Sequence, residues 1–364
     1  MEPRDRVVSE QSGVGDGRKQ WIRRCLVLFF AVATAVAIYF AWRQGERDFR
    51  WSVFAATFTR MNWGWFSVSM GLVALTYVGR AVRWRLMMRP VRENPSFGGL
   101  LRSTVIGFTA VVLFGRAGEL VRPYLISLRE RVSFSSQVAA WLLERIYDLL
   151  SVLLLFGFAL SRISSSSSKV GPGVEWVLQT GGHMVGILCT VCLAILVTFG
   201  LFPDFVEQRL FAVIEVLPGR LKERLQGMVK AFVAGTGSTR NFSFVSLLIL
   251  YTFTEWLLIT ASFLSLFKAF PATEALGFID SLIVVGFVAF GSAIQIPGVG
   301  GGMQVATVLI LTELFRIPLE TASGIAILIW LITFVMVVPF GLVLALRDGL
   351  QWRKLMDKKN LEAV

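Results

Sequence analysis

The sequence predicts an all-α polytopic membrane protein with about six full transmembrane helices and two re-entrant helical hairpins. Hydrophobic residues make up 55% of the 364-residue chain and charged residues only 16%, whereas a soluble domain carries roughly 25% charged residues. Apolar runs of about 20 residues, the length that crosses a bilayer, recur along the chain. Two further apolar segments are interrupted by glycine and charge. These observations exclude an ordinary soluble domain.

The uninterrupted apolar runs predict full spans at about 21–42, 63–88, 134–160, 182–202, 242–267 and 322–346. Between the first two, residues 49–63 mix tryptophan, phenylalanine and arginine, which favours a short interfacial helix. Residues 203–240 predict an amphipathic cytoplasmic insert. The transmembrane domain thus covers 21–347, preceded by a polar segment at 1–20 that we expect to be disordered and followed by a basic tail at 348–364.

The two interrupted segments, at about 98–128 and 276–314, break in corresponding ways. Each contains Gly-Phe-x-Ala, beginning at Gly107 and at Gly286, and each then stays apolar for about two turns. The first breaks at Gly-Arg-Ala-Gly-Glu-Leu-Val-Arg-Pro and the second at Pro-Gly-Val-Gly-Gly-Gly. Paired interruptions of this kind in a membrane protein point to the binding site of a transported substrate.

The distribution of basic residues predicts the orientation. The chain has a formal net charge of +12, but its lysines and arginines flank apolar spans, which indicates cytoplasmic loops of the inner membrane rather than nucleic-acid binding. Placing the basic loops and both termini in the cytoplasm requires each interrupted segment to enter and leave the membrane on the same side. The halves at 63–160 and 242–346 then form an inverted repeat. The alternative is a topology of eight full spans, which would violate the positive-inside rule in the middle of the chain.

Charged residues inside the predicted spans are candidates for a polar cavity. Each costs at least about 2.5–3.5 kcal/mol near a helix centre and therefore needs a partner or a cavity. Glu144 and Asp148 share one helix face, and Arg145 can pair with Asp148. They form a charge cluster that fixes helix packing, the polar wall of a substrate cavity, or both, since the two roles are compatible. Glu255 is a proton site, a partner for a cavity arginine or one end of a structural salt bridge.

The first interruption offers an anion site. Arg116, Glu119 and Arg122 recur every three residues, so we expect them on one face. Arginines beside a broken helix suit a phosphate, although they can also be loop charges held by Glu119. Arg80 and Arg83 lie one turn apart near the end of their span, where we interpret them as positive-inside headgroup anchors, with ligand contact as the alternative.

The second interruption offers backbone amides rather than charged side chains. Gln295 precedes Pro297 and Gly298, and Gly300 opens a run of three glycines. Exposed backbone amides at such a place can bind an anion or a lipid headgroup. No Lys-Ser/Thr follows, so the run is not a nucleotide-binding P-loop.

Other chemistry finds little support in the sequence. Cys25, Cys189 and Cys192 lie within apolar spans, where we expect them to have packing roles. We expect His183 to lie at the membrane interface. No metal-ligand, cofactor or triad pattern is present, so we expect no cofactor and no enzyme activity. The one candidate acid/base pair for an intramembrane enzyme is Glu119 with Glu144.

The chain resembles the flippase-like family of the lysylphosphatidylglycerol synthetase transmembrane region over about 20–347. The resemblance rests on four motifs, which are Gly-Arg-Ala-Val-Arg-Trp-Arg at 79–85, Gly-Arg-Ala-Gly-Glu-Leu-Val-Arg-Pro at 115–123, Glu-Arg-Ile-Tyr-Asp at 144–148 and Pro-Gly-Val-Gly-Gly at 297–301. It implies a functional core of Arg116, Gly118, Glu119, Arg122, Glu144, Arg145, Asp148, Pro297, Gly298 and Gly300.

Two departures limit what the resemblance implies. Full-length synthetases carry a cytosolic aminoacyltransferase domain after the membrane part, so lipid aminoacylation does not carry over to a chain that ends at 364. The family also often has an arginine in the last span, where this chain has Ile329-Trp330-Leu331. We therefore expect flippase-like binding or movement of a phospholipid or polyprenyl-phosphate lipid. The alternative is a non-transporting subunit that presents lipid to a separate glycosyl- or aminoacyltransferase.

Overall fold

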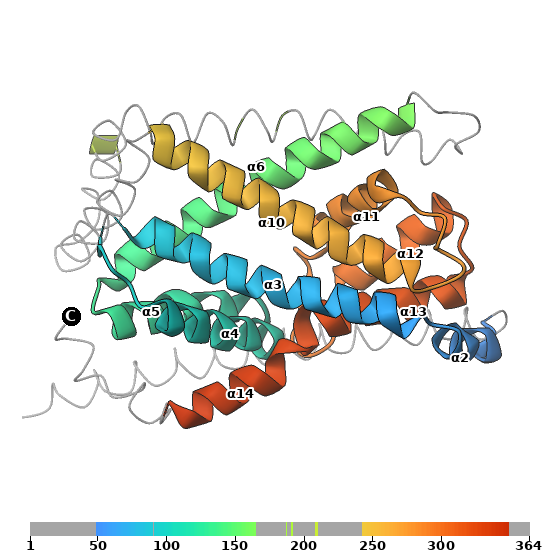
Figure 1. Cartoon of the computed structure of the whole chain (residues 1–364), viewed down its shortest axis with the longest axis horizontal. Coiled ribbons are helices and arrows are strands. Elements are labelled where there is room, and N and C mark those ends of the chain that lie inside the picture. The colour runs from blue at the N-terminus through green and yellow to red at the C-terminus, as the bar shows by residue number, and fades with distance from the viewer. Residues whose placement is uncertain are drawn as a thin grey trace, which may run out of the picture. The chain divides into compact units, whose positions relative to one another are not determined.

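The computed structural model describes residues 49–89, 91–164, 187, 191, 208–209 and 242–348 (Figure 1). The chain divides into two units, 1–52 and 53–364, and nearly all of the described residues lie in the second. Several predicted features lie outside the described residues: the segment 1–20, the span 21–42, nearly all of 182–202 and 203–240, the tail after 348, the three cysteines and His183.

The described part is almost entirely helical. Its helices are α2 (Trp51–Thr59), α3 (Trp63–Met88), α4 (Phe97–Phe114), the 3₁₀ helix η1 (Gly115–Leu120), α5 (Val121–Glu130), α6 (Phe134–Ser164), α10 (Phe242–Lys268), α11 (Phe278–Gly291), α12 (Gly302–Glu313), α13 (Leu319–Trp330), the π-helical turn η3 (Leu331–Val335) and α14 (Val337–Arg347). Among these residues, four helical stretches are long and apolar enough to cross a membrane: Trp63–Met88, Phe97–Glu130, Ser246–Lys268 and Leu319–Arg347. The predicted all-α membrane fold is therefore confirmed at this level.

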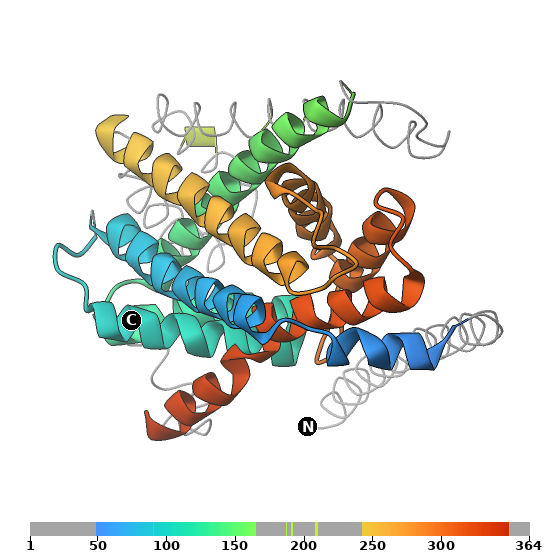
Figure 2. The same ribbon diagram turned by 45° about the vertical axis from the view of Figure 1, so that its right-hand side comes forward.

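Helices α3 and α10 form an antiparallel pair, side by side in both ribbon views (Figures 1 and 2). The Asn62 N–H, just before α3, donates to the Ala269 carbonyl just after α10, at 2.8 Å. Further along α3, the Ser69 hydroxyl donates to the Ser262 carbonyl at 2.8 Å. The Asn62 side chain also caps α3, accepting from two backbone amides of its first turn.

The first interrupted segment is a helical hairpin in which α4 and α5 pack against each other across η1. Glycine makes this close packing possible. A Cβ on Gly118 would lie 2.2 Å from the Ala110 carbonyl oxygen, and one on Gly107 would lie 2.5 Å from the Arg122 Cβ. Gly115 begins the reversal with a φ of 62°, a left-handed conformation that favours glycine. The stretch Phe97–Glu130 is thus folded on itself.

The second interrupted segment is also a hairpin. Helices α11 and α12 pack together and are joined by two short antiparallel strands, β1 (Gln295–Ile296) and β2 (Gly300–Gly301). The helices approach so closely at Gly291 that a Cβ there would lie 2.4 Å from the Gly302 carbonyl oxygen. Glycine at the end of one helix and the start of the next therefore sets the spacing of this hairpin.

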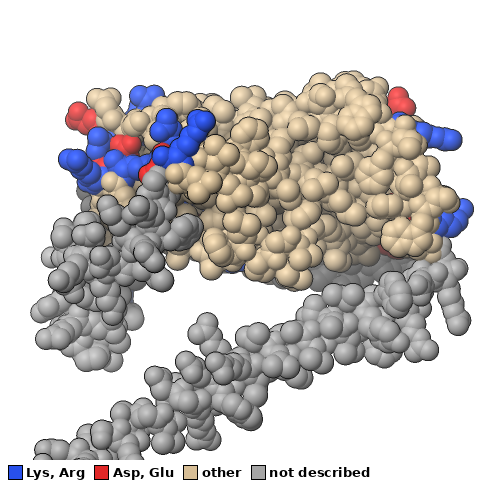
Figure 3. Space-filling view, turned by 90° about the horizontal axis from the view of Figure 1, so that it is seen from below, with Lys and Arg blue, Asp and Glu red and all other residues tan. Residues whose placement is uncertain are grey.

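The two hairpins meet at their tips. The Gly298 N–H donates to the Val112 carbonyl at 2.8 Å, and the Pro297 ring lies against Gly115. Their bases lie at opposite ends of the α3–α10 pair, the first beside the end of α3 and the second beside the end of α10. On the face drawn in Figure 3, charged side chains gather toward the two ends and the surface between them is uncharged.

The same helix contacts recur in both halves. Helix α3 packs on α4 as α10 packs on α11, and α5 packs on α6 as α12 packs on α13. Across the halves, α4 packs on α14 and α11 packs on α6. Together with the antiparallel α3 and α10, this pattern is what two inverted copies of one unit would produce.

The last predicted span, 322–346, differs from a single regular helix. Helix α13 ends at Trp330, the π-helical turn η3 follows, and α14 continues to Arg347. Pro339 lies in the first turn of α14, where its ring cannot donate a backbone hydrogen bond and would clash with the carbonyl four residues earlier. A π-helical turn before a proline relieves that conflict, and it turns α14 toward α4 of the first hairpin.

Replacing Gly118 by alanine is expected to destabilise the protein by about 1–3 kcal/mol or more, because the new Cβ cannot fit against the α4 backbone. The measurement is the midpoint of thermal unfolding of the purified protein in detergent.

The matched control is Gly98→Ala, since a Cβ at Gly98 meets nothing within 4 Å and alanine favours a helix. Equal midpoints for the two variants would show that α4 and α5 are not in close contact at Gly118.

Candidate functional site

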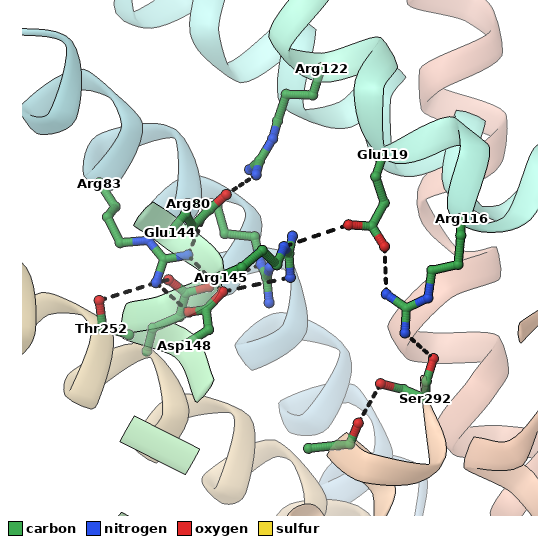
Figure 4. Close-up of polar contacts among 12 residues, drawn as sticks. Arg80, Arg83, Arg116, Glu119, Arg122, Glu144, Arg145, Asp148, Thr252 and Ser292 are labelled. Atoms are coloured by element: carbon green, nitrogen blue, oxygen red, sulfur yellow. Dashed lines mark hydrogen bonds and ion pairs between the residues drawn. The ribbon is translucent and has the colours of Figure 1, made fainter. Parts of the chain in front are cut away.

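A cavity of about 170 Å³ lies between α3, the first hairpin, α6, α10 and the second hairpin. Its charged lining residues are Arg80, Arg116, Glu119, Arg122, Arg145 and Asp148. Aromatic and aliphatic side chains, among them Phe108, Trp141 and Trp256, form the rest of the wall. Figure 4 shows the charged side chains converging from different helices. Of the charged residues singled out from the sequence, the lining thus includes Arg116, Glu119, Arg122, Arg145 and Asp148 but not Glu144 or Glu255.

Arg83 is the buried centre of this site, with only 1% of its side chain exposed. It contacts Glu144 at 2.5 Å and Asp148 at 2.6 Å, both on α6. On α10 it contacts Glu255 at 3.3 Å and donates to the Thr252 hydroxyl at 3.2 Å (Figure 4). One guanidinium on α3 thereby connects three helices.

Arg122 at the start of α5 is also buried, at 3% exposure. Its Nη2 donates to Glu144 on α6, and its guanidinium stacks on the Trp84 ring, with 4.1 Å from Cζ to the ring centroid. Its Nη1 is buried and has no hydrogen-bond partner among the described residues. Arg122 is one of the residues that line the cavity, and the Nη1 atom itself is fully buried.

A second branch of the network runs to the hairpin tips. Arg145 lies 3.7 Å from Asp148 on one side and 3.6 Å from Glu119 on the other. Glu119 pairs with Arg116 at 2.5 Å, and Arg116 donates to the Ser292 carbonyl of the second hairpin at 2.5 Å. The chain of charges therefore ends in a direct contact between the two hairpins (Figure 4).

Arg80 lies one helical turn before Arg83 and also faces the cavity. Its Nε is 3.0 Å from Glu255, and its guanidinium lies 4.8 Å from the centre of the Phe108 ring. Glu255 thus serves as the partner of two arginines, one of the roles that the sequence left open.

The structure corrects two of the interpretations from sequence. Arg83 is not a headgroup anchor at a membrane surface, and Arg80 faces the cavity, because carboxylates of α6 and α10 face this side of α3. Arg116 and Arg122 do not form one set with Glu119. The tight η1 turn directs Arg116 to Glu119 at the tip, whereas Arg122 begins the next helix and turns to Glu144.

The second hairpin contributes less to the cavity than its motif predicts. Gln295 lines it, and its side-chain amide lies 3.5 Å from the Val111 carbonyl. Pro297 and Gly298 make the tip contact instead, and the space beside Gly300 is filled by the Gln304 side chain. Like Gly118, these residues set the shape of the hairpins.

Sequence reasoning did not identify several polar groups of the site. Trp141 and Thr333 line the cavity, and the Trp141 Nε1 and the Thr333 hydroxyl are buried without a hydrogen-bond partner among the described residues. Trp84 was visible in the motif at 79–85 but carried no signal for stacking on Arg122. The Ser292 contribution is a backbone carbonyl, which no residue type could have indicated.

Fold and site together define a mostly helical membrane protein with a cavity lined with arginines. Comparison with known sequences gives the family. The chain matches the family described as the lysylphosphatidylglycerol synthase TM region over residues 26–341. It therefore belongs to that family, as the motifs at 115–123 and 144–148 predicted.

A partial match to a curated protein adds a second relationship. The chain is 29% identical over 103 residues to a protein named glycosyltransferase AglD from Haloferax volcanii. These residues are 28% of this chain and 16% of that protein, so the chain spans a small part of the length of the relative. No solved structure matches significantly.

Replacing Glu144 by glutamine is expected to destabilise the protein by about 3–5 kcal/mol, because it leaves buried arginine charge without its partner. Thermal unfolding in detergent measures the effect. A double variant with Arg122→Gln removes the orphaned cation as well.

The double variant should lose less stability than the two single variants added together, because the residues form one pair. Strict additivity would mean that Glu144 and Arg122 do not interact in the folded protein.

Proposed function

We propose that this protein binds a phosphate-bearing lipid through its headgroup and moves it between the leaflets of the cytoplasmic membrane. The observation that carries the proposal is that four arginines, Arg80, Arg116, Arg122 and Arg145, line one cavity. The buried Nη1 of Arg122 also lacks a hydrogen-bond partner among the described residues. Guanidinium groups bind phosphate by forked, charge-assisted hydrogen bonds. A desolvated donor that lacks a protein partner costs free energy unless a ligand satisfies it.

In the same proposal both hairpins are re-entrant and enter from opposite sides, with the termini and basic loops in the cytoplasm. The tip contact and the opposite placement of the hairpin bases support this arrangement, because neither hairpin continues past the other. Non-helical backbone is tolerated at membrane depth where it is buried in protein or lines a cavity. The strands β1 and β2, packed against the end of α4, meet that condition.

Movement of the lipid would follow from one half rocking against the other about the tip contact. The antiparallel α3–α10 pair and the recurring contacts of the two halves support an inverted repeat, the architecture on which alternating access is built. The Arg116–Ser292 contact links the cavity network to the second hairpin. An anion in the cavity would compete with Glu119 for the Arg116 guanidinium. Arg116 would then turn toward the anion, and its contact with the Ser292 carbonyl would weaken.

A second candidate function is favoured by the partial match to a protein named a glycosyltransferase. Here the chain would hold a lipid phosphate in the same cavity and present it to a separate glycosyl- or aminoacyltransferase without moving it across the membrane. Both functions require the headgroup site. A transferase gene adjacent to the gene for this chain would favour the second.

Lipid movement in reconstituted vesicles tests the first function. Wild-type protein is expected to accelerate the exposure of a labelled anionic phospholipid from the inner leaflet, and Arg122→Ala is expected to lower the rate at least about tenfold, since charge-assisted bonds are worth about 1.5–3 kcal/mol. Arg116→Ala should have a smaller effect, because the side chain is 48% exposed.

Arg102→Ala is the control, because Arg102 is an exposed arginine outside the cavity. If wild-type protein binds anionic lipid but does not move it, the first function is excluded and the second is supported. An Arg122→Ala variant as active as wild type would overturn the site assignment.

A further inference from the structure

We propose that Glu255 takes up a proton when an anion binds in the cavity, so that the protein carries a proton with each anionic lipid that it moves. The proton comes from the surrounding water and forms an O–H bond with a carboxylate oxygen of Glu255. This inference rests on the proposed function and adds its coupling ion, because a pH difference across the membrane would then drive the lipid.

Glu255 is the most weakly held carboxylate around Arg83. Glu144 and Asp148 each accept a hydrogen bond from Arg83, at 2.5 and 2.6 Å. Glu255 lies farther from the same guanidinium, at 3.3 Å, and neither of its buried oxygens accepts a hydrogen bond from a described residue. Carboxylates that share one guanidinium repel one another, and the one with the fewest hydrogen bonds gains most from a proton.

The second cation beside Glu255 is Arg80, and Arg80 also faces the cavity. Its Nε lies 3.0 Å from Glu255, and 17% of its side chain is exposed. Arg80 is among the residues that line the cavity, whereas Glu255, with 4% of its side chain exposed, is not. Arg80 therefore links the buried carboxylate to an anion in the cavity.

An anion in the cavity and Glu255 compete for the same guanidinium. When the anion binds Arg80, less of the Arg80 charge remains to stabilise an ionised Glu255. Arg83 cannot replace it, because two closer carboxylates already share that guanidinium. A buried carboxylate without sufficient compensation becomes neutral by taking up a proton. Anion binding and proton uptake therefore favour each other, and this coupling is reciprocal.

The charged groups that act on Glu255 come from α3 and α6. They are Arg80, Arg83, Glu144 and Asp148. Helices α11 and α13 also pack on α10, but each has its one acidic residue, Asp280 or Glu320, in its first turn. The arginines favour the ionised form of Glu255 and the carboxylates favour the protonated form. Weakening the Arg80 contact shifts this balance toward the protonated form.

A second cavity, of about 70 Å³, lies beside the first and gives water access to Arg80. Its polar lining consists of Thr76, Tyr77, Arg80, Ser262 and Thr333. A cavity can hold water if it has room for a water-sized sphere, roughly 10–15 Å³, and offers polar partners. This one meets both conditions, and Arg80 and Phe108 line both cavities. It therefore provides a hydroxyl-lined approach for a proton to the Arg80–Glu255 contact.

Calorimetric titration of the purified protein with dihexanoyl phosphatidylglycerol tests the coupling. The phosphodiester of this probe does not titrate near neutral pH, so any proton exchanged belongs to the protein. We expect the binding enthalpy to differ between Hepes and Tris, which have different ionisation enthalpies, by the amount that corresponds to proton uptake. The affinity should also rise as the pH falls, by up to about tenfold per pH unit.

Glu255→Gln is the decisive variant, because glutamine has the shape of a protonated glutamate but exchanges no proton. It should bind the probe with the same enthalpy in both buffers and with little dependence on pH. The matched control is Asp348→Asn, which removes a carboxylate that pairs with Arg102 and Arg129 outside the cavity. It should keep the proton uptake of the wild type.

The outcomes separate this inference from the proposed function. If wild-type protein binds no probe, the proposed headgroup site fails and the proton coupling fails with it. If wild-type protein binds the probe with equal enthalpy in both buffers, phosphate binding stands and the proton coupling is overturned. Proton uptake that persists in Glu255→Gln would place the proton on another carboxylate, such as Glu119, and overturn the assignment. The wild-type comparison decides the coupling even if Glu255→Gln fails to fold.

Discussion

The buried Arg83 guanidinium is the constraint on which the rest of the structure depends. A cation without water around it is tolerated only if carboxylates and hydrogen-bond acceptors surround it. Two carboxylates of α6 and one of α10 do so, and this fixes how the three long helices are rotated about their axes. Glu144 then presents its second oxygen to Arg122, which positions the first hairpin against the same centre.

The same network separates a fixed part of the site from an exposed part. Arg83, Glu144, Asp148 and Glu255 are all at least nine-tenths buried. The buried apolar cluster that contains Trp84, Leu143 and Tyr147 is formed on the same helices as Arg83 and Glu144. Toward the hairpin tips Arg145 makes longer contacts, at 3.6 and 3.7 Å, and the side chains are more exposed, 36% for Arg145 and 48% for Arg116. Exposed ion pairs contribute little stability, so this end can exchange partners at low cost while the centre stays in place.

Sequence alone predicted several of the described helices and singled out the intramembrane carboxylates, because each of these depends on local chemistry. Apolar length gave α3 and α10 to within one residue, and the cost of intramembrane charge singled out Glu144, Asp148 and Glu255. Which arginine meets which carboxylate could not be predicted. That depends on long-range packing, and it placed Arg83 at the buried centre rather than at a membrane surface. The π-helical turn before Pro339 and the meeting of the hairpin tips likewise depend on neighbours remote in sequence.

The contact between the hairpin tips is made largely by backbone atoms. The Gly298 amide bonds the Val112 carbonyl, and Arg116 and Gln295 each approach a carbonyl of the opposite hairpin. A carbonyl is the same whichever residue bears it, so Val112, Val111 and Ser292 can be exchanged during evolution without loss of their part in this contact. Homologous chains can therefore preserve the joint between their two halves while sharing few residues there, and the strongest sequence constraint at the tip falls on the glycines that shape the turns.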